Sequence, residues 1–283
     1  SSWSHLGINW EVELKSHFKI ASKMLGVQPC PVHHIQDEYL KNTALSLGVE
    51  GTFNPVPLGI YFGNPDQITP DPYFQGAGPP RTGCTSCGTC LAGCEPGAKN
   101  TLDLNYLYLA EGLGAEILPL RKATLIRKVI DGYEIHMNHP FDHRIHYEPL
   151  RAPKVFLAAG VLGTLELLLR SQDMGTLSQL SPMLGQRVRT NSEAITAVLS
   201  RDRDIDLTQG PSISSDFYLN DYTHVTQNRL PPSYWFMKLY SGPLVDGNKP
   251  ARRALNTLWE FLRHPGNSTA SYRVLEDWHK RIS

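Results

Sequence analysis

Apolar residues recur at the spacing of amphipathic helices in several parts of the chain. The first two helices are predicted over residues 8–26 and 36–48, and each ends at a glycine that can close a helix in the left-handed conformation. Further helices are predicted over residues 101–115, 164–172 and 251–266. The last of these is closed by a Pro-Gly pair, which cannot continue a helix.

Other stretches have the pattern of strands. Residues 115–137 predict two strands joined by a turn at Asp131-Gly132. Residues 154–160, KVFLAAG, form a short apolar run typical of a buried strand, and the helix at 164–172 follows it directly. Strand, glycine turn and helix in succession make half of a βαβ unit. Further strands are predicted at residues 59–62, 193–200 and 223–228.

Composition narrows the class of protein. Apolar residues make up 41% of the chain, and 27 basic residues balance 27 acidic ones, which predicts a globular protein with no nucleic-acid or acidic-membrane partner held by bulk charge. The apolar runs fall short of the ~18 residues of a membrane span, and no signal peptide opens the chain. The chain begins at Ser1 without a methionine, so we expect it to be a piece of a longer protein.

Four of the five cysteines lie within one short, glycine-containing loop, RTGCTSCGTCLAGCEPGAKN. Their spacing, C-x2-C-x2-C-x3-C, is that of an iron–sulfur loop in bacterial ferredoxins. Gly83, Gly88 and Gly93 would permit the positive-φ turns that bring the thiolates together. We therefore predict Cys84, Cys87, Cys90 and Cys94 as metal ligands in a cytoplasmic, reducing environment.

Three alternatives for this loop remain open. A structural zinc site usually takes two separated cysteine pairs, which this run does not supply. Disulfides between such close cysteines are possible but often strained. The thiols could also be reduced and bind nothing.

The stretch from Gly83 to Ile117 resembles the middle of the glucose–methanol–choline oxidoreductases, in particular their bacterial cholesterol-oxidase-like branch. The stretches at residues 8–27, 51–63, 71–84, 154–172 and 184–195 resemble further segments of that branch in the same order. The resemblance covers nearly the whole chain. It implies a flavoprotein that oxidises a CH–OH group of an alcohol, sterol or sugar by hydride transfer to FAD.

The resemblance also implies an α/β fold, with part of a Rossmann-like FAD-binding domain and an α+β substrate domain built on an antiparallel sheet. Residues 1–80 would belong to the substrate domain or its cap, and residues 81–190, with the cysteine loop, to the FAD-binding domain. Residues 191–283 would supply further strands and a helix of the substrate domain. Some relatives have a three-cysteine iron–sulfur site, whose spacing Cys84, Cys90 and Cys94 match. Such a cluster would pass electrons to an external acceptor.

Seven residues are candidates for cofactor binding. Ala159, Gly160 and Gly163 lie at a strand-to-helix turn, where small side chains let backbone N–H groups approach a cofactor or let strand and helix pack closely. The resemblance favours FAD proximity there. It also places Asn191 and Ser192 by the flavin ring, Thr124 by the adenine and Asn100 along the flavin. The alternative for Asn191 and Ser192 is a solvated turn. For Thr124 it is a buried sheet position, and for the segment of Asn100 it is the start of a helix.

Two family features are not found in this sequence. The N-terminal G-x-G-x-x-G turn that seats the FAD pyrophosphate is absent, and the catalytic histidine segment is not evident. No residue is therefore named as the catalytic base. An iron–sulfur electron-transfer module and an inactive truncated product stay as alternative functions.

Overall fold

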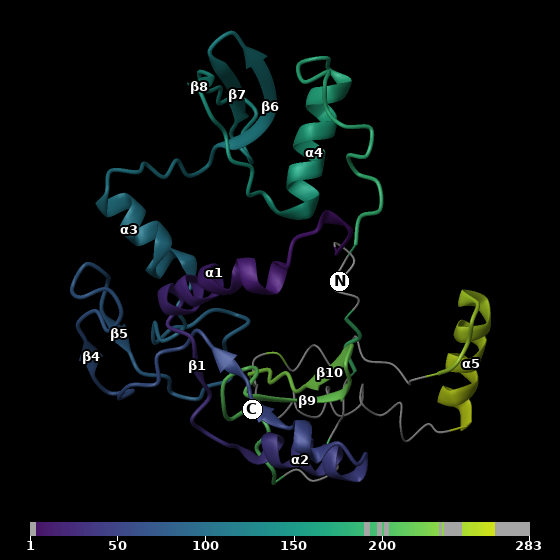
Figure 1. Cartoon of the computed structure of the whole chain (residues 1–283). Helices are drawn as coiled ribbons and strands as arrows, with labels where there is room; N and C mark the ends of the chain where they lie inside the picture. Colours follow the sequence, from purple (N-terminus) through teal and green to yellow (C-terminus); the bar gives the residue numbers. More distant parts are fainter. Residues whose placement is uncertain are drawn as a thin grey trace. The chain divides into compact units, whose positions relative to one another are not determined.

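The computed structural model describes residues 4–189, 193–196, 200, 204–231, 234 and 245–263. The chain divides into two compact units (Figure 1). The first combines Ser1–Gly114 with Ala197–Ser283, and the second is Ala115–Thr196. This division reflects compactness alone, so the assignment of residues 1–80, 81–190 and 191–283 to substrate and FAD-binding domains stays a prediction.

The first unit begins with two helices that the sequence predicts. Helix α1 is Trp10–Met24 and helix α2 is Ile35–Ser46. Asn9 caps α1 by accepting a hydrogen bond from the Val12 amide. Gly26 follows α1 with a φ of +58°, and a Cβ there would meet the Tyr73 ring at 2.2 Å. Glycine is therefore required at this turn for both its backbone conformation and its lack of a side chain.

The helix predicted over residues 101–115 is broken into two parts. A 3-10 turn at Leu102–Leu104 precedes the shorter helix α3, Tyr106–Gly112. Asn105 lies between them with a non-helical φ of −135°, and its side chain accepts a hydrogen bond from the Tyr106 amide. The prediction is right about the element and wrong about its length, because an asparagine cap interrupts the periodic stretch.

Short antiparallel sheets complete the first unit. Strands β10 (Thr223–Thr226), β9 (Ser215–Asn220) and β2 (Asn54–Pro55) form a three-stranded sheet, on which α2 packs. Ala44 of α2 and Phe217 of β9 are buried in the core. Two-stranded pairs join β1 (Gln28–Pro29) to β3 (Pro57–Leu58) and β4 (Ile68–Thr69) to β5 (Arg81–Thr82).

The second unit contains the predicted hairpin. Strands β6 (Lys122–Val129) and β7 (Gly132–Asn138) pair antiparallel, and β8 (Leu150–Ala152) adds to β7. Gly132 has a φ of +137° at the turn, where a Cβ would meet the Ala152 carbonyl oxygen at 2.3 Å. Helix α4 (Gly160–Asp173) packs on β6, whose Ile126 amide donates to Ser171 Oγ at 3.0 Å. The hairpin and α4 are confirmed.

The strand predicted at residues 154–160 is wrong. Residues 154–158 form no strand, α4 begins at Gly160 rather than residue 164, and Phe156 is 92% exposed. A buried strand needs a neighbour for its main-chain hydrogen bonds. All strand pairs of the described sheets are antiparallel, so no parallel Rossmann-type sheet forms among the described residues. The fold is mixed α and β with small antiparallel sheets.

The other predicted strands and the last helix have mixed outcomes. Residues 59–62 form no regular strand, since Ile60 makes a single bridge to Lys99. Residues 193–196 also form none, and residues 197–199 lie outside the described part. The prediction at 223–228 is confirmed by β10. Helix α5, Pro250–Arg263, confirms the last helix, whose predicted closing Pro-Gly pair at 265–266 lies outside the described residues.

Candidate functional site

The cysteine loop follows β5 and turns by means of its glycines. Gly88 has a φ of +70° and Gly93 a φ of +127°, as predicted. A Cβ at Gly88 would also meet the Thr208 carbonyl oxygen at 2.5 Å. Gly83 serves a different purpose from the predicted one. Its φ is not positive, but a Cβ there would lie 1.9 Å from the Gly63 carbonyl oxygen, so the absence of a side chain permits close packing of two segments.

A segment distant in sequence crosses this loop and fixes it. The Gly210 amide donates to the Ser86 carbonyl at 2.7 Å, and Cys87 and Gly210 form a parallel bridge. The Ser212 hydroxyl donates to the Gly88 carbonyl at 3.3 Å. The loop is therefore held by hydrogen bonds to residues more than 100 positions later in the sequence.

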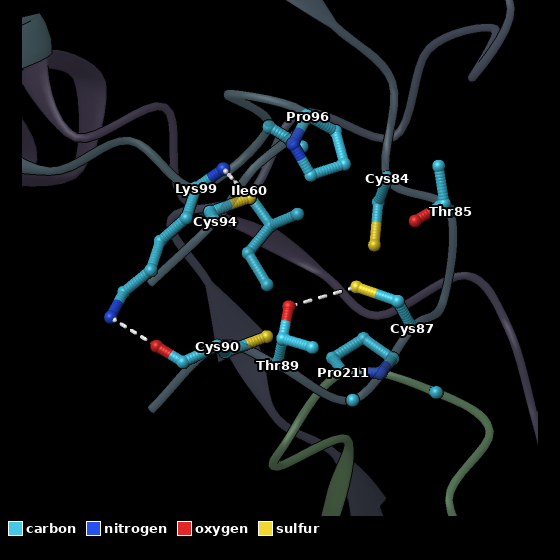
Figure 2. A pocket seen from close by; sticks show the side chains of 13 residues that line it. Ile60, Cys84, Thr85, Cys87, Thr89, Cys90, Cys94, Pro96, Lys99 and Pro211 are labelled. Carbon is cyan, nitrogen blue, oxygen red and sulfur yellow. Dashed lines mark hydrogen bonds between the residues drawn. The ribbon is translucent and has the colours of Figure 1, made fainter. Parts of the chain in front are cut away.

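The four clustered thiols line one small cavity (Figure 2). Amide groups donate to three of the sulfur atoms: Ser86 to Cys84 at 3.4 Å, Lys99 to Cys94 at 3.3 Å, and Ser212 to Cys90 at 3.4 Å. The Cys87 sulfur lies 3.0 Å from the Thr89 hydroxyl oxygen. Figure 2 shows Ile60 among the sulfur atoms, and this side chain also lines the cavity.

Two of these thiols differ in their ionisation. Burial raises the pKa of Cys84 to about 11, so this thiol is protonated at neutral pH. Burial also raises the pKa of Cys87, but hydrogen bonds from Thr89 and Thr85 outweigh it and the pKa is lowered overall. Cys87 is exposed, whereas Cys84 is partly buried. The loop therefore contains one thiol suited to reaction with solutes and one protected from it.

The predicted metal site is not supported by this geometry. Among the described residues, no three cysteine, histidine, aspartate or glutamate side chains form a group that could hold one metal ion. None of the five cysteines is in a disulfide. Cys84, Cys87, Cys90 and Cys94 share one cavity. The iron–sulfur cluster stays a prediction from spacing.

Asn100 is buried at 5% exposure, and its side-chain amide bonds to two other segments. Its Oδ1 accepts from Arg81 Nη2 at 2.9 Å, and its Nδ2 donates to the Met24 carbonyl at 3.3 Å. Arg81 is itself buried, and its guanidinium lies 5.9 Å from the centre of the Tyr73 ring. In this arrangement Asn100 joins α1 to the segment after the cysteine loop.

The other cofactor candidates lie in the second unit. Ala159 precedes α4 and makes no side-chain capping bond, and Gly160 has a φ of +68° with nothing within 4 Å of a Cβ placed on it. Gly163 lies one turn further, where its Cβ would come 3.1 Å from that of Ala159. The small side chains at the start of α4 therefore leave its backbone amide groups accessible, which fits the approach of a phosphate-bearing cofactor.

Thr124 lies on β6 in the same unit as α4. Its hydroxyl donates to the His136 carbonyl at 3.3 Å across the hairpin, so a contact with a cofactor would be made by its main chain. Asn191 and Ser192 lie outside the described residues. The candidates thus divide into Thr124, Ala159, Gly160 and Gly163 in one unit, and Asn100 with the cysteines in the other.

Sequence reasoning missed a buried polar cluster in the first unit. Asp37 on α2 and Arg229 after β10 form an ion pair in which both side chains are buried, with Ser214, Ser215 and Gln227 bonded to the same carboxylate. No local motif signals it, because its members lie up to 192 positions apart.

These features define a protein of mixed α and β structure in which the small residues at the start of α4 and the thiol-lined cavity occur in separate units. No protein-family model matches the chain. Among curated proteins, the chain is 39% identical over 257 residues to the cholesterol oxidase of Mycobacterium tuberculosis, in strains CDC 1551 and H37Rv. That alignment covers 88% of this chain and 44% of the relative.

A second species supplies a similar match. The chain is 35% identical over 268 residues to the cholesterol oxidase of Acinetobacter baumannii, covering 91% of this chain and 48% of the relative. The chain is a homologue of cholesterol oxidases, which confirms the predicted resemblance to the glucose–methanol–choline oxidoreductases and their cholesterol-oxidase-like branch. It spans about half the length of the curated relatives it matches.

Proposed function

We propose that this chain contributes the central part of an FAD-dependent oxidoreductase that acts on CH–OH groups. The observation that carries the proposal is the identity of 35–39% to cholesterol oxidases along about nine-tenths of the chain. Side chains alone do not accept a hydride, so such chemistry needs a redox cofactor. When bound, FAD would accept the hydride from the carbinol carbon, while a base takes the hydroxyl proton and a carbonyl product forms.

The part of this chain closest to the cofactor would be the start of α4. Ala159, Gly160 and Gly163 would offer main-chain N–H groups without a side chain in the way, and the positive dipole end of the helix favours an anionic group. Thr124 would contribute main-chain contacts, and Asn191 and Ser192 are assigned to the flavin by family resemblance alone. Asn100 would act by positioning α1 against the chain after the cysteine loop.

A sterol is the substrate class that the relatives' names support, and a sugar or a simple alcohol is the alternative. The thiol-lined cavity enters this proposal only as a structural element. An iron–sulfur cluster that passes electrons to an external acceptor is proposed from the cysteine spacing alone. A cytoplasmic location is proposed from the cysteine usage alone. Iron and sulfide analysis of protein purified anaerobically tests the cluster separately from the flavin.

The test of the function uses the product of the whole gene that encodes this chain. We expect the purified protein to show the absorption bands of oxidised flavin, and anaerobic addition of cholesterol to bleach them. Epicholesterol, in which the hydroxyl has the opposite configuration, is the matched control substrate. A protein that contains no flavin and takes up none when FAD is added contradicts the proposal.

A pair of matched variants tests the placement of the cofactor. Gly160→Leu and Gly175→Leu change the first residue of α4 and a glycine just after its end, with φ of +68° and +70° and open space around each. Both variants carry the same backbone strain. We expect Gly160→Leu to lower flavin content much more than Gly175→Leu. Equal flavin content in the two variants would contradict the placement and leave the oxidoreductase assignment intact.

A further inference from the structure

Helix α5 carries its apolar and its charged residues on opposite faces. At about 3.6 residues per turn, Ala251, Ala254, Leu255, Leu258, Trp259, Phe261 and Leu262 occupy one continuous arc of about 160°. The opposite arc carries Arg252, Arg253, Asn256, Glu260 and Arg263. An α-helix with an arc this wide and apolar buries it against something.

In the part of the chain that the structure describes, the side chains of this apolar face are largely exposed. Leu255, Leu258, Trp259 and Leu262 are each 56% to 67% exposed, and Phe261 is 38% exposed. No other helix or strand in the described part of the chain packs extensively on α5. The face therefore contrasts with that of α2, which packs on β9 and contributes the fully buried Ala44 to the core.

The charges of α5 determine which partner fits. Three arginines stand against one glutamate on the polar arc, and Lys249 precedes the helix. The Arg263 guanidinium lies 4.9 Å from the centre of the Trp259 ring, at the border between the two arcs. Leucine and tryptophan on one face with arginine on the other is the pattern of a helix lying in the interface of a lipid bilayer.

We propose that α5 is a docking surface for an anionic lipid bilayer. The apolar arc would enter the boundary between headgroups and acyl chains, and the arginines would contact lipid phosphates. The helix would lie in the plane of the interface, in agreement with the finding that no described helix is long and apolar enough to span a membrane. The chain has zero net charge, so the attraction arises from the local charge of α5. The inference stands on α5 alone and does not rest on the proposed function.

Flotation of the full chain with lipid vesicles tests the proposal. One set contains equal parts phosphatidylcholine and phosphatidylglycerol, and the other phosphatidylcholine alone. We expect flotation with the anionic set, weaker flotation with the neutral set, and a decrease with added salt. Failure to float with the anionic vesicles at low salt overturns the proposal.

Substitutions on each arc separate docking by α5 from other attachment. Leu258→Asp should weaken vesicle binding at least about tenfold, since it places a charge where the leucine would enter the bilayer. Ile130→Asp is the matched control, because Ile130 is fully exposed in the turn between β6 and β7. Equal weakening by the two variants overturns the proposal.

The arginines are tested in the same way. Arg252→Gln with Arg253→Gln should weaken binding to anionic vesicles about 30-fold, at roughly fivefold for each charge. Lys15→Gln with Lys19→Gln removes the same charge from exposed positions of α1 and should have a much smaller effect. A chain that self-associates through α5 in solution, dissociates on Leu258→Asp and ignores vesicles would show that a second copy covers the face, against the proposal.

Discussion

Arg229 and Asp37 form a buried ion pair, with 2.8 Å between Nη2 and Oδ2, across 192 positions of sequence. The pair ties α2 to the chain after β10. Arg229 Nη1 also donates to Ser214 Oγ at 2.6 Å and to the Pro211 carbonyl at 2.9 Å. Pro211 lines the thiol cavity, so the ion pair supports the segment that fixes the cysteine loop.

Removal of one partner should therefore destabilise the first unit strongly. Arg229→Met leaves the Asp37 carboxylate buried without its counter-charge, and we expect a loss of about 3–5 kcal/mol in the free energy of unfolding. Urea titration followed by circular dichroism measures it. Arg144→Met is the control, because the Arg144–Asp142 pair is on the surface and its arginine is exposed. Similar losses for the two variants would show that the buried pair contributes no more to the free energy of unfolding than the surface pair does.

The same cluster predicts two steps of acid destabilisation. Burial raises the pKa of Asp37, but hydrogen bonds from Ser214, Ser215 and the His34 amide, with the charge of Arg229, outweigh it and hold the pKa below its ordinary value. Its contribution to stability is present above the unfolded pKa of about 3.9 and is lost as the pH falls through the folded pKa. Burial, with the nearby Arg229 charge, lowers the pKa of His34.

For His34, the unfolded chain binds the proton more tightly, so stability should fall as the pH drops below the unfolded pKa of about 6.5. Unfolding midpoints measured from pH 8 to pH 3 should show a first loss near this value and a further loss below about pH 4. His34→Gln should flatten the first step and leave the second. An unchanged first step in this variant would show that protonation of His34 does not cause it.

Thiol reactivity should follow the two environments found in the cysteine loop. Cys87 is exposed with a lowered pKa, whereas burial raises that of Cys84 to about 11. A short pulse of iodoacetamide at neutral pH, with labelled cysteines mapped by mass spectrometry, should modify Cys87 first. Cys30, which is buried with a raised pKa, is the internal control for slow reaction. Faster labelling of Cys84 than of Cys87 would contradict this order.

The crossing of the cysteine loop by residues 207–212 gives a further test. Gly88→Ala places a Cβ at positive φ and 2.5 Å from the Thr208 carbonyl oxygen, so the crossing segment must move. Gly97→Ala has a similar φ of +74°, with nothing within 4 Å. The strain common to both costs about 1–2 kcal/mol. We expect Gly88→Ala to cost clearly more than Gly97→Ala in thermal unfolding, and equal costs would contradict the observed crossing.

Local signals in the sequence were sufficient to predict most of the helices and one hairpin. Gly26 marks the end of α1, and Asp131-Gly132 marks the turn between β6 and β7. The strand at residues 154–160 could not be predicted correctly from its apolar pattern, because a strand also requires a neighbouring strand. The interruption at Asn105 depends on a capping hydrogen bond that periodicity does not detect.

The geometry of the cysteine loop could not be predicted from the sequence, for a related reason. Cysteine spacing indicates that four thiols share a loop, and the structure places them on one cavity. Spacing does not give their distances, which depend on the chain at Gly210 and Ser212 and on Ile60 between the thiols. The Asp37–Arg229 pair had no sequence signal, since neither residue stands in a recognisable motif.

The central claim is that this chain belongs to the core of a flavin-dependent enzyme that oxidises an alcohol. Its most direct test is an anaerobic titration of the purified whole-gene product with cholesterol, followed by flavin absorbance. The account predicts loss of the oxidised flavin bands in step with formation of the 3-ketone, and return of the bands when an electron acceptor is added. A flavin spectrum that no sterol, sugar or simple alcohol changes, or the absence of any bound flavin, would contradict it.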